Sequence, residues 1–168
     1  MAKLVRYLFA DTIENNIKFG MKDASHEDVV AAAKKACCHD FIMSLPEGYS
    51  TVIGEGGATL SGGEKQRISI ARAILKDAPV IILDETTANV DPENEDKLIA
   101  AFNALTENKT VIMIAHRLKT IRNADQIVVL DGGRINCGTH EELLESSEKY
   151  SSFIKFREEA ASWKMQSA

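Results

Sequence analysis

Long apolar runs are missing from this sequence. Its apolar runs, such as Val80–Leu83 and Val111–Ala115, are far short of the roughly 20 residues that a membrane-spanning helix needs. The first residues also lack the charged-then-apolar pattern of a targeting segment. We therefore expect no membrane crossing within these 168 residues, and any membrane role should come through a partner chain or another part of the protein.

Clusters of basic residues and of cysteines are absent as well. The formal net charge is -5, and Lys and Arg are scattered among acids, which argues against direct nucleic-acid binding. The three cysteines, Cys37, Cys38 and Cys137, fit no metal-ligand spacing, and adjacent Cys37 and Cys38 do not suggest a disulfide framework. These absences predict a protein of a reducing cytosol with no nucleic-acid partner.

One globular domain is the expected organisation. Apolar residues make up 45% and charged residues 27% of the chain, which is the balance of a folded soluble protein. Asp11–Ile17 and His26 to about Phe41 have helical spacing, and Ser25 is predicted to cap the second helix. Further along, apolar runs alternate with helical patterns, which predicts an α/β sheet with helices on its faces. The expected strands are 80–83, 110–115, 124–130 and a fourth strand through Cys137, which follows a turn at 131–133. The expected helices are 62–76, 92–104, a helix capped by Thr139, and 148–163.

A serine and two glycines open the helix expected at 62–76. They are Ser61, Gly62 and Gly63, followed by Glu64. The first N–H groups of a helix have no partner within it, and glycines let an anion approach them closely. Phosphate is the anion that we expect there. The same residues also fit an ordinary serine-capped helix with flexible glycines.

Two adjacent carboxylates follow the apolar run Val80–Leu83. They are Asp84 and Glu85. Ligands of open α/β sheets bind at the carboxyl ends of the strands, and two acids held there are costly without a cation. The alternative is a solvated strand end followed by a turn.

Two further polar residues lie next to expected elements. His116 comes directly after the strand expected at 110–115, and therefore lies at the same edge of the sheet as Asp84 and Glu85. Taken alone, it fits a structural histidine as well as a catalytic one. Asp91 precedes Pro92 and fits a helix N-cap. An N-cap residue can have a functional role as well.

Together these strings resemble the motifs of ATP-binding cassette (ABC) proteins, in the family's order and spacing from about Phe9 to the end of the chain. Leu60–Arg67 resembles the signature motif, and Val80–Glu85 resembles the Walker B motif. Asp91 resembles the D-loop that faces a partner subunit, and His116 resembles the switch histidine.

Two segments resemble ABC exporters in particular. Leu8–Ile13 is similar to the segment after the Q-loop, and Thr51–Gly57 is similar to the loop that couples to the membrane domain. The resemblance implies a P-loop NTPase-like ABC ATPase core sheet with helices on its faces, an α-helical subdomain, and a missing N-terminal part. It implies one partial nucleotide-binding domain over 1–168, with the helical subdomain at about 10–75 and the α/β core at about 76–168.

The resemblance also implies cofactors, partners and residue roles. ATP and Mg²⁺ are the expected cofactors, with Asp84 on the metal, Glu85 polarising the attacking water and His116 on the terminal phosphate. In this family two domains dimerise head to tail, so Ser61–Glu64 would bind nucleotide held by a second domain, which Asp91 would face. A transmembrane exporter domain is the other expected partner, and the chain would lie in the cytoplasm at the inner face of the cell membrane.

Some family features are absent from the sequence. It contains no G-x-x-x-x-G-K-[ST] phosphate loop, and the aromatic residue that stacks on adenine in the family is equally missing. Leu4 stands where the Q-loop glutamine is expected, and Glu64 and Asn89–Val90 differ from the commonest family residues. By resemblance the chain is an ABC-type ATPase, and we expect it to be inactive alone because nothing in it brings nucleotide to the acids.

The interpretation that we adopt is an ATP-binding and ATP-hydrolysing subunit or fragment of a bacterial-type exporter. One alternative is a catalytically incompetent module that only completes a partner's site through Ser61–Gly63. Another is a soluble relative working in DNA repair or translation, against which the Glu55 loop and the lack of a basic surface argue. A third is a gene fragment with no stable product.

The missing phosphate loop also leads to an expectation about the sheet. In the complete family domain the strand that bears this loop lies close to the Walker B strand. We therefore expect Val80–Leu83 to lack neighbours and to present an unpaired apolar edge. Poor solubility of the chain alone would follow.

Overall fold

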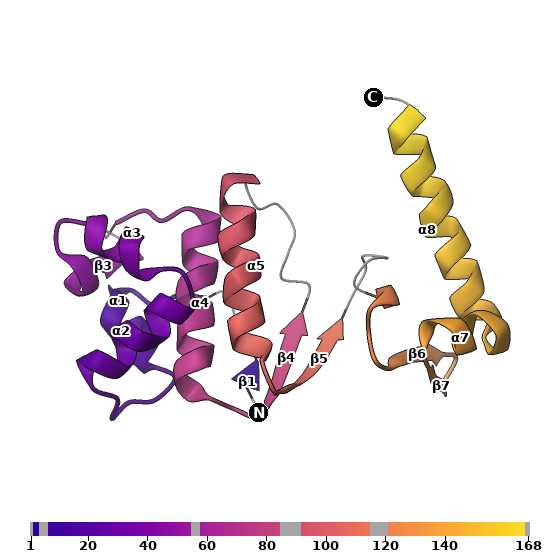
Figure 1. Ribbon diagram of the computed structural model, residues 1–168, viewed down its shortest axis with the longest axis horizontal. Coiled ribbons are helices and arrows are strands. Elements are labelled where there is room, and N and C mark those ends of the chain that lie inside the picture. The colour runs from indigo at the N-terminus through magenta and orange to yellow at the C-terminus, as the bar shows by residue number, and fades with distance from the viewer. Residues whose placement is uncertain (1, 4–6, 55–57, 85–91, 115–120, 167–168) are drawn as a thin grey trace. The chain divides into compact units, whose positions relative to one another are not determined.

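The computed structural model of the chain describes residues 2–3, 7–54, 58–84, 92–114 and 121–166, and it divides into two compact units (Figure 1). The first unit is Met1–Ile114 and the second is Ala115–Ala168. Both units combine helices with strands, so the predicted mixed α/β class is confirmed. The predicted division into a helical part at about 10–75 and a core at about 76–168 stays a prediction.

The N-terminal half of the first unit contains four short helical segments, α1 (Ile13–Lys18), α2 (His26–Lys35), α3 (His39–Ser44) and the 3-10 turn η1 (Gly48–Ser50). The helix expected at 11–17 starts two residues late because Asp11–Thr12 (β2) pairs antiparallel with Val52–Ile53 (β3). Thr12 then caps α1, its side chain accepting the Asn15 N–H at 3.1 Å.

The helix expected from His26 to about Phe41 is in fact two helices. Ser25 caps α2 as predicted, since its Oγ accepts the Asp28 N–H at 3.1 Å and the Asp28 carboxylate accepts the Ser25 N–H at 2.9 Å. Cys37 then has a positive φ of 52°, a left-handed conformation that an α-helix cannot continue through. The chain turns at this point, and α3 begins at His39.

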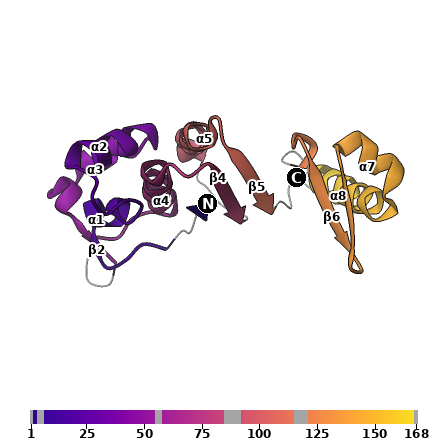
Figure 2. The same cartoon turned by 90° about the horizontal axis from the view of Figure 1, so that it is seen from below.

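Three parallel strands form the sheet of the first unit, in the order β1 (Ala2–Lys3), β4 (Val80–Asp84) and β5 (Thr110–Ile114). Figure 2 shows β4 and β5 side by side. The strands predicted at 80–83 and 110–115 are confirmed, the second as far as Ile114. Between them α5 (Pro92–Thr106) confirms the helix predicted at 92–104 and provides the crossover that a parallel pair requires.

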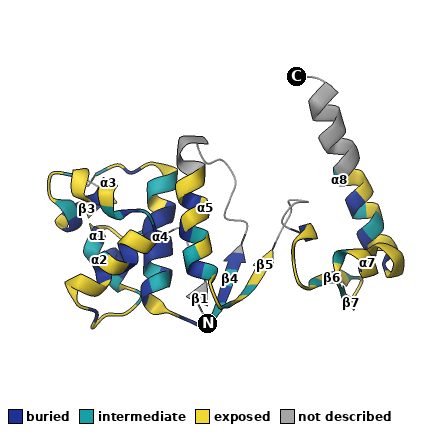
Figure 3. Ribbon diagram, in the orientation of Figure 1, coloured by how far each residue is buried: buried dark blue, intermediate teal, exposed yellow. Residues whose placement is uncertain are grey.

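Strand β4 is the middle strand, which corrects the expectation that Val80–Leu83 lacks neighbours. Ile81 pairs with Ala2 on one side and with Val111 on the other, and it is 0% exposed. The exposed apolar strand is β5, where Ile112 is 52% exposed (Figure 3). The expectation was wrong because it took a neighbour of β4 to be missing, whereas this chain supplies both.

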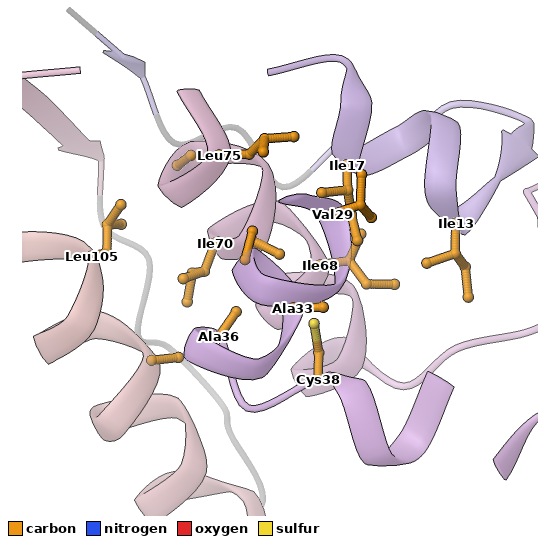
Figure 4. Packing of buried hydrophobic residues seen from close by; sticks show 14 of the residues in the cluster. Ile13, Ile17, Val29, Ala33, Ala36, Cys38, Ile68, Ile70, Leu75 and Leu105 are labelled. Atoms are coloured by element: carbon orange, nitrogen blue, oxygen red, sulfur yellow. The ribbon is translucent and has the colours of Figure 1, made fainter. Parts of the chain in front are cut away.

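Helix α4 (Gly62–Lys76) confirms the helix predicted at 62–76 and carries the core of the first unit. In Figures 1 and 2 it lies between α1–α3 on one side and the sheet strands on the other. Figure 4 shows the packing of its buried side chains, Ile68, Ile70 and Leu75, among Ile17, Val29, Ala33 and Leu105. Burying each large aliphatic side chain stabilises the fold by about 1.5–3 kcal/mol, so α4 is fixed on both sides.

The second unit is a hairpin followed by two helices, β6 (Ile127–Asp131), β7 (Arg134–Gly138), α7 (His140–Ser146) and α8 (Glu148–Gln166). β6 begins three residues later than the predicted residue 124. The predicted turn is confirmed, with Gly132 and Gly133 at positive φ values of 53° and 82°, as a tight hairpin turn requires. The Thr139 cap of α7 is also confirmed.

One face of this hairpin packs on the two helices of the second unit. Ile127 and Val129 of β6 contact the cluster of Leu143, Tyr150 and Ile154. The opposite face is open, with exposed apolar side chains at Val128, Leu130 and Ile135. None of the helices in the described part of the chain has the length and apolarity that crossing a membrane requires.

Candidate functional site

The start of α4 is a capping box formed by Ser61 and Glu64. The Ser61 N–H donates to Glu64 Oε2 at 2.7 Å, and the Glu64 N–H donates to Ser61 Oγ at 3.3 Å. Ser61 has extended backbone angles, and the helix begins at Gly62. The predicted serine-capped helix start is confirmed.

The first two residues of α4 are glycines, and the chain itself does not require one at Gly62. A Cβ added to Gly62 would meet no atom within 4 Å, and its φ lies outside the left-handed region. Glycine is a weaker helix former than alanine by about 1 kcal/mol, so the fold gains nothing from it there. The N–H groups of Gly62 and Gly63 have no acceptor within the helix. Because Ser61 and Gly62 are exposed, this backbone is open to a ligand from outside the chain.

The body of α4 fixes the direction in which these N–H groups point. Gln66 to Ala71 are all buried, and the Arg67 guanidinium carbon lies 5.3 Å from the centre of the Phe41 ring on α3. A cation–π contact of this kind contributes about 0.5–2 kcal/mol. The helix start is thus held by a rigid element, which keeps backbone donors in place for a charged ligand.

A second polar cluster, which the sequence analysis missed, ties α4 to the segment before α1. Asn16 is 1% exposed, and its side-chain amide accepts the Phe9 N–H at 2.8 Å and donates to the Phe9 carbonyl at 3.0 Å. Arg72 of α4 donates to Asn16 Oδ1 at 3.0 Å, to the Asn16 carbonyl at 2.7 Å and to the Tyr7 carbonyl at 3.0 Å.

Arg72 also lies against two aromatic rings. Its guanidinium carbon is 5.5 Å from the ring centre of Phe9 and 5.5 Å from that of Phe19, and burial lowers the pKa of Arg72 from its ordinary value. Phe9 belongs to the exporter-like segment Leu8–Ile13. Arg72 and Asn16 therefore hold this segment against the helix that carries the signature-like string. An arginine among the apolar positions of α4 was the only local signal, and its partner 56 residues away could not be read from spacing.

The carboxyl ends of β4 and β5 are aligned. Asp84 is the last residue of β4 and pairs in register with Ile114, the last residue of β5. This is the edge at which the sequence places the acids and the histidine. Glu85, Asp91 and His116 lie outside the described residues, and of Asp84 the structure describes the backbone. The described geometry thus covers the start of α4 and the end of β4.

A divalent cation would suit the end of β4 by its donor chemistry. Mg²⁺ is commonly held by one or two protein carboxylates, with phosphate and water oxygens in the remaining positions. Asp84 offers one carboxylate at the end of a central parallel strand, and Glu85 follows it in the sequence. The residues present therefore fit a Mg²⁺ ion that arrives with a phosphate ligand.

Comparison with known proteins decides the family. The family model described as "ABC transporter" matches residues 3–88, a range that includes α4 and β4. This chain belongs to the ABC transporter family. The match begins at Lys3, which lies in β1. The motifs in the sequence indicated a later start, at about Phe9. Within the family, the chain is an ATP-binding module of an ABC transporter.

Relatives with curated names extend the similarity over most of the chain. The "ATP-dependent lipid A-core flippase" of Syntrophus aciditrophicus is 54% identical over 144 residues, which are 85% of this chain and 24% of that protein. The "Mitochondrial potassium channel ATP-binding subunit" of Mus musculus is 51% identical over 149 residues, 88% of this chain and 21% of that protein. The "Beta-(1-->2)glucan export ATP-binding/permease protein NdvA" of Brucella melitensis is 48% identical over 149 residues, which are 88% of this chain and 25% of that protein. The chain spans about a quarter of the length of the curated relatives it matches.

Proposed function

We propose that this chain is the ATP-binding and ATP-hydrolysing part of an ABC exporter, and that the start of α4 binds the terminal phosphate of an ATP held by a second ABC nucleotide-binding domain. The observation that carries the proposal is the exposed, open backbone at Gly62 beside the Ser61 cap, inside the range that matches the family. A helix start of this kind favours a phosphate group through its N–H donors and the helix dipole. Head-to-tail packing of two domains would bring a phosphate to it.

The residues after β4 and β5 would act on the other ATP of such a head-to-tail pair. Mg²⁺, when bound, neutralises charge on the phosphate oxygens. Asp84 would hold it at the end of β4, and Glu85 would accept a hydrogen bond from the attacking water and orient that water toward the γ-phosphate. His116 donates to the terminal phosphate, and Asp91 faces the second domain.

Catalysis by this chain alone is not part of the proposal. The sequence contains no G-x-x-x-x-G-K-[ST] string, whose amides and lysine supply much of the phosphate binding and of the transition-state stabilisation. We expect the chain alone to bind ATP weakly and to hydrolyse it at the background rate. Titration calorimetry and a phosphate-release assay measure both. Micromolar affinity with steady turnover that Glu85→Gln abolishes would contradict this account.

Coupling to a transmembrane exporter domain is a further part of the proposal. The names of two relatives contain "flippase" and "permease", and the matched region is about a quarter of their length. The cluster of Arg72 and Asn16 fixes the exporter-like segment Leu8–Ile13 on α4, which would transmit motion between α4 and a membrane partner. The chain would then work at the inner face of the cell membrane.

A second candidate function is a module that only completes a partner's ATP site. The absence of a phosphate-loop string from the sequence favours it. Mixing the chain with a complete ABC nucleotide-binding domain distinguishes the two functions. Turnover that depends on Ser61 but not on Glu85 identifies the completing module, whereas turnover that also falls with Glu85→Gln identifies hydrolysis on this chain's own acids.

A further inference from the structure

We propose that the peptide bond between Asp131 and Gly132, at the tip of the β6–β7 hairpin, is a site of spontaneous backbone isomerisation, and that Lys149 slows this reaction. An aspartate followed by glycine forms a cyclic imide most readily, because glycine has no Cβ to hinder its own nitrogen. Asp131–Gly132 is the only Asp-Gly pair in the sequence, which contains no Asn-Gly pair. None of the residues of the proposed function takes part.

The reaction has two steps and needs no reagent besides water. In the first, the Gly132 nitrogen forms a bond to Cγ of the protonated Asp131 carboxyl group, and the carboxyl hydroxyl leaves with the nitrogen's proton as water. In the second, water adds to the main-chain carbonyl carbon of Asp131, and the bond from that carbon to the Gly132 nitrogen breaks. The nitrogen stays bonded to Cγ, so the product is isoaspartate, with the same composition and a main chain longer by one carbon atom.

The surroundings of this peptide bond leave room for both steps. The Asp131 side chain is 46% exposed, and a Cβ added to Gly132 would meet no atom within 4 Å. Exposed loop tips are also where changes to the chain are best tolerated. The imide ring and the attacking water therefore both have space at the tip of the hairpin.

An ion pair restrains the side chain that has to react. Lys149 Nζ on α8 lies 2.8 Å from Asp131 Oδ1. Closing the imide ring turns Cγ until it nearly eclipses the main-chain carbonyl carbon, an arrangement away from the staggered rotamers. Because the ion pair holds the Asp131 side chain in one rotamer, it makes this arrangement rarer and slows the reaction.

The product would disturb the hairpin. Asp131 pairs with Arg134 across the two-residue turn of Gly132 and Gly133. A turn of this length fixes the register of its two strands, and an additional main-chain atom at Asp131 changes the length of the connection. Isomerisation therefore alters the β6–β7 pairing at its closed end.

The test is to incubate the full chain at pH 7.4 and 37 °C and to follow isoaspartate in the tryptic peptide 123–134. This peptide contains Asp131 and also Asp125, which precedes Gln126 and serves as an internal reference. Chromatography separates the isomeric peptides, and an aspartate-specific protease cleaves at aspartate but not at isoaspartate. We expect isoaspartate to accumulate faster at Asp131 than at Asp125.

Three variants separate the ion pair from other effects. Lys149→Gln should speed isomerisation roughly two- to fivefold, the factor that corresponds to a typical surface ion pair. Lys149→Arg keeps a cation for Asp131 and should retain the native rate. Lys155→Gln is the matched control, because it removes the same charge from another exposed position of α8, and it should also leave the rate unchanged. In concentrated urea, which removes the ion pair together with the fold, the native chain and Lys149→Gln should isomerise at the same rate.

Several results would overturn the proposal. Equal accumulation at Asp131 and Asp125 would show that the Asp-Gly pair is not a preferred site. Equal rates in the folded native chain and in folded Lys149→Gln, or an equal acceleration by Lys155→Gln, would show that the ion pair does not control the reaction. A difference between the native chain and Lys149→Gln that persists in urea would contradict the structural cause.

Discussion

Strands β4 and β5 lie side by side and have nearly the same apolar character, yet one is buried and the other is exposed (Figure 3). In β4, Ile81 and Leu83 are 0% and 2% exposed, whereas in β5 Ile112 and Ile114 are 52% and 53% exposed. β4 has a strand on each side, and β5 is the edge strand in the described part of the sheet. Apolar residues thus predict the strand, but burial depends on whether the chain also supplies its cover.

The second unit repeats this contrast on a single hairpin. Ile127 and Val129 of β6 pack on the helices, while Val128 and Leu130 are exposed, together with Ile135 of β7. Exposed apolar strand surfaces of this kind promote pairing with another polypeptide.

The largest expected effect is on the free energy of unfolding, and it should differ between two isoleucines on neighbouring strands. Ile81→Ala removes a fully buried side chain from β4 and should lower the free energy of unfolding by about 2–5 kcal/mol. Ile112→Ala makes the same chemical change on exposed β5 and should stay within about 0.5–1 kcal/mol. Urea unfolding of both variants measures the difference. Equal losses would mean that β5 is covered after all.

Self-association through β5 is the next effect. We expect the chain alone to associate, because among the described residues β5 has a strand on one side only, and its side chains are largely apolar. The double substitution Ile112→Lys and Ile114→Lys should raise the apparent dissociation constant of the associated form at least tenfold, about 1.4 kcal/mol. Sedimentation over a range of concentrations measures it. A native chain that stays monomeric throughout would refute this prediction.

Thiol reactivity gives a further comparison between a buried residue and an exposed one. Burial raises the pKa of the Cys38 thiol to about 12, so it is almost entirely un-ionised at pH 8, and the thiolate is the reactive form. Cys137 is exposed on the hairpin. Iodoacetamide at pH 8 should therefore modify Cys137 at least ten times faster than Cys38, as peptide mass spectrometry can measure. Comparable rates would show that the core of the first unit opens readily.

The smallest effect concerns an ion pair on the surface of the first unit. A hydrogen bond from Lys18, at 2.8 Å, holds the pKa of Glu14 below its ordinary value of 4.5, and His26 adds to this at 2.9 Å. Because the folded-state pKa is depressed, the stabilisation is present above pH 4.5 and is lost as the pH falls through the folded-state value. Glu14→Gln should cost about 0.5 kcal/mol at pH 7.

The control for this pair is Glu107→Gln, which removes the same charge from an exposed position after α5. Unfolding measured between pH 7 and pH 3 should show a difference between native chain and Glu14→Gln that shrinks with acid. A difference that grows as the pH falls would contradict the sign of the shift.

Local signals predicted the elements that carry the family's motifs. Ser61 and the two glycines after it marked the start of α4, and the apolar run Val80–Leu83 marked β4. The helix break at Cys37 was missed because a left-handed residue is usually a glycine, and the sequence has a cysteine at this position. β1 was missed because Ala2–Lys3 is too short to show a pattern.

Long-range features were the ones that the sequence did not reveal. The contact between Arg72 and Asn16 joins residues 56 positions apart, and no spacing rule links them. The exposure of β5 depends on which strands lie beside it, and its apolar sequence does not show that. The roles of Glu85, Asp91 and His116 stay predictions, since these residues lie outside the described part of the chain.

The measurement that tests the account most directly uses Gly62→Ala. A methyl group at this position meets no atom of the chain within 4 Å, so the variant should unfold at the same denaturant concentration as the native chain or at a higher one. It would, however, stand between the helix start and an incoming phosphate. Sedimentation with a complete ABC nucleotide-binding domain should show ATP-dependent association of the native chain, weakened at least tenfold, about 1.4 kcal/mol, by Gly62→Ala. Association of the variant as strong as that of the native chain would contradict the claim that the start of α4 binds the nucleotide of a second domain.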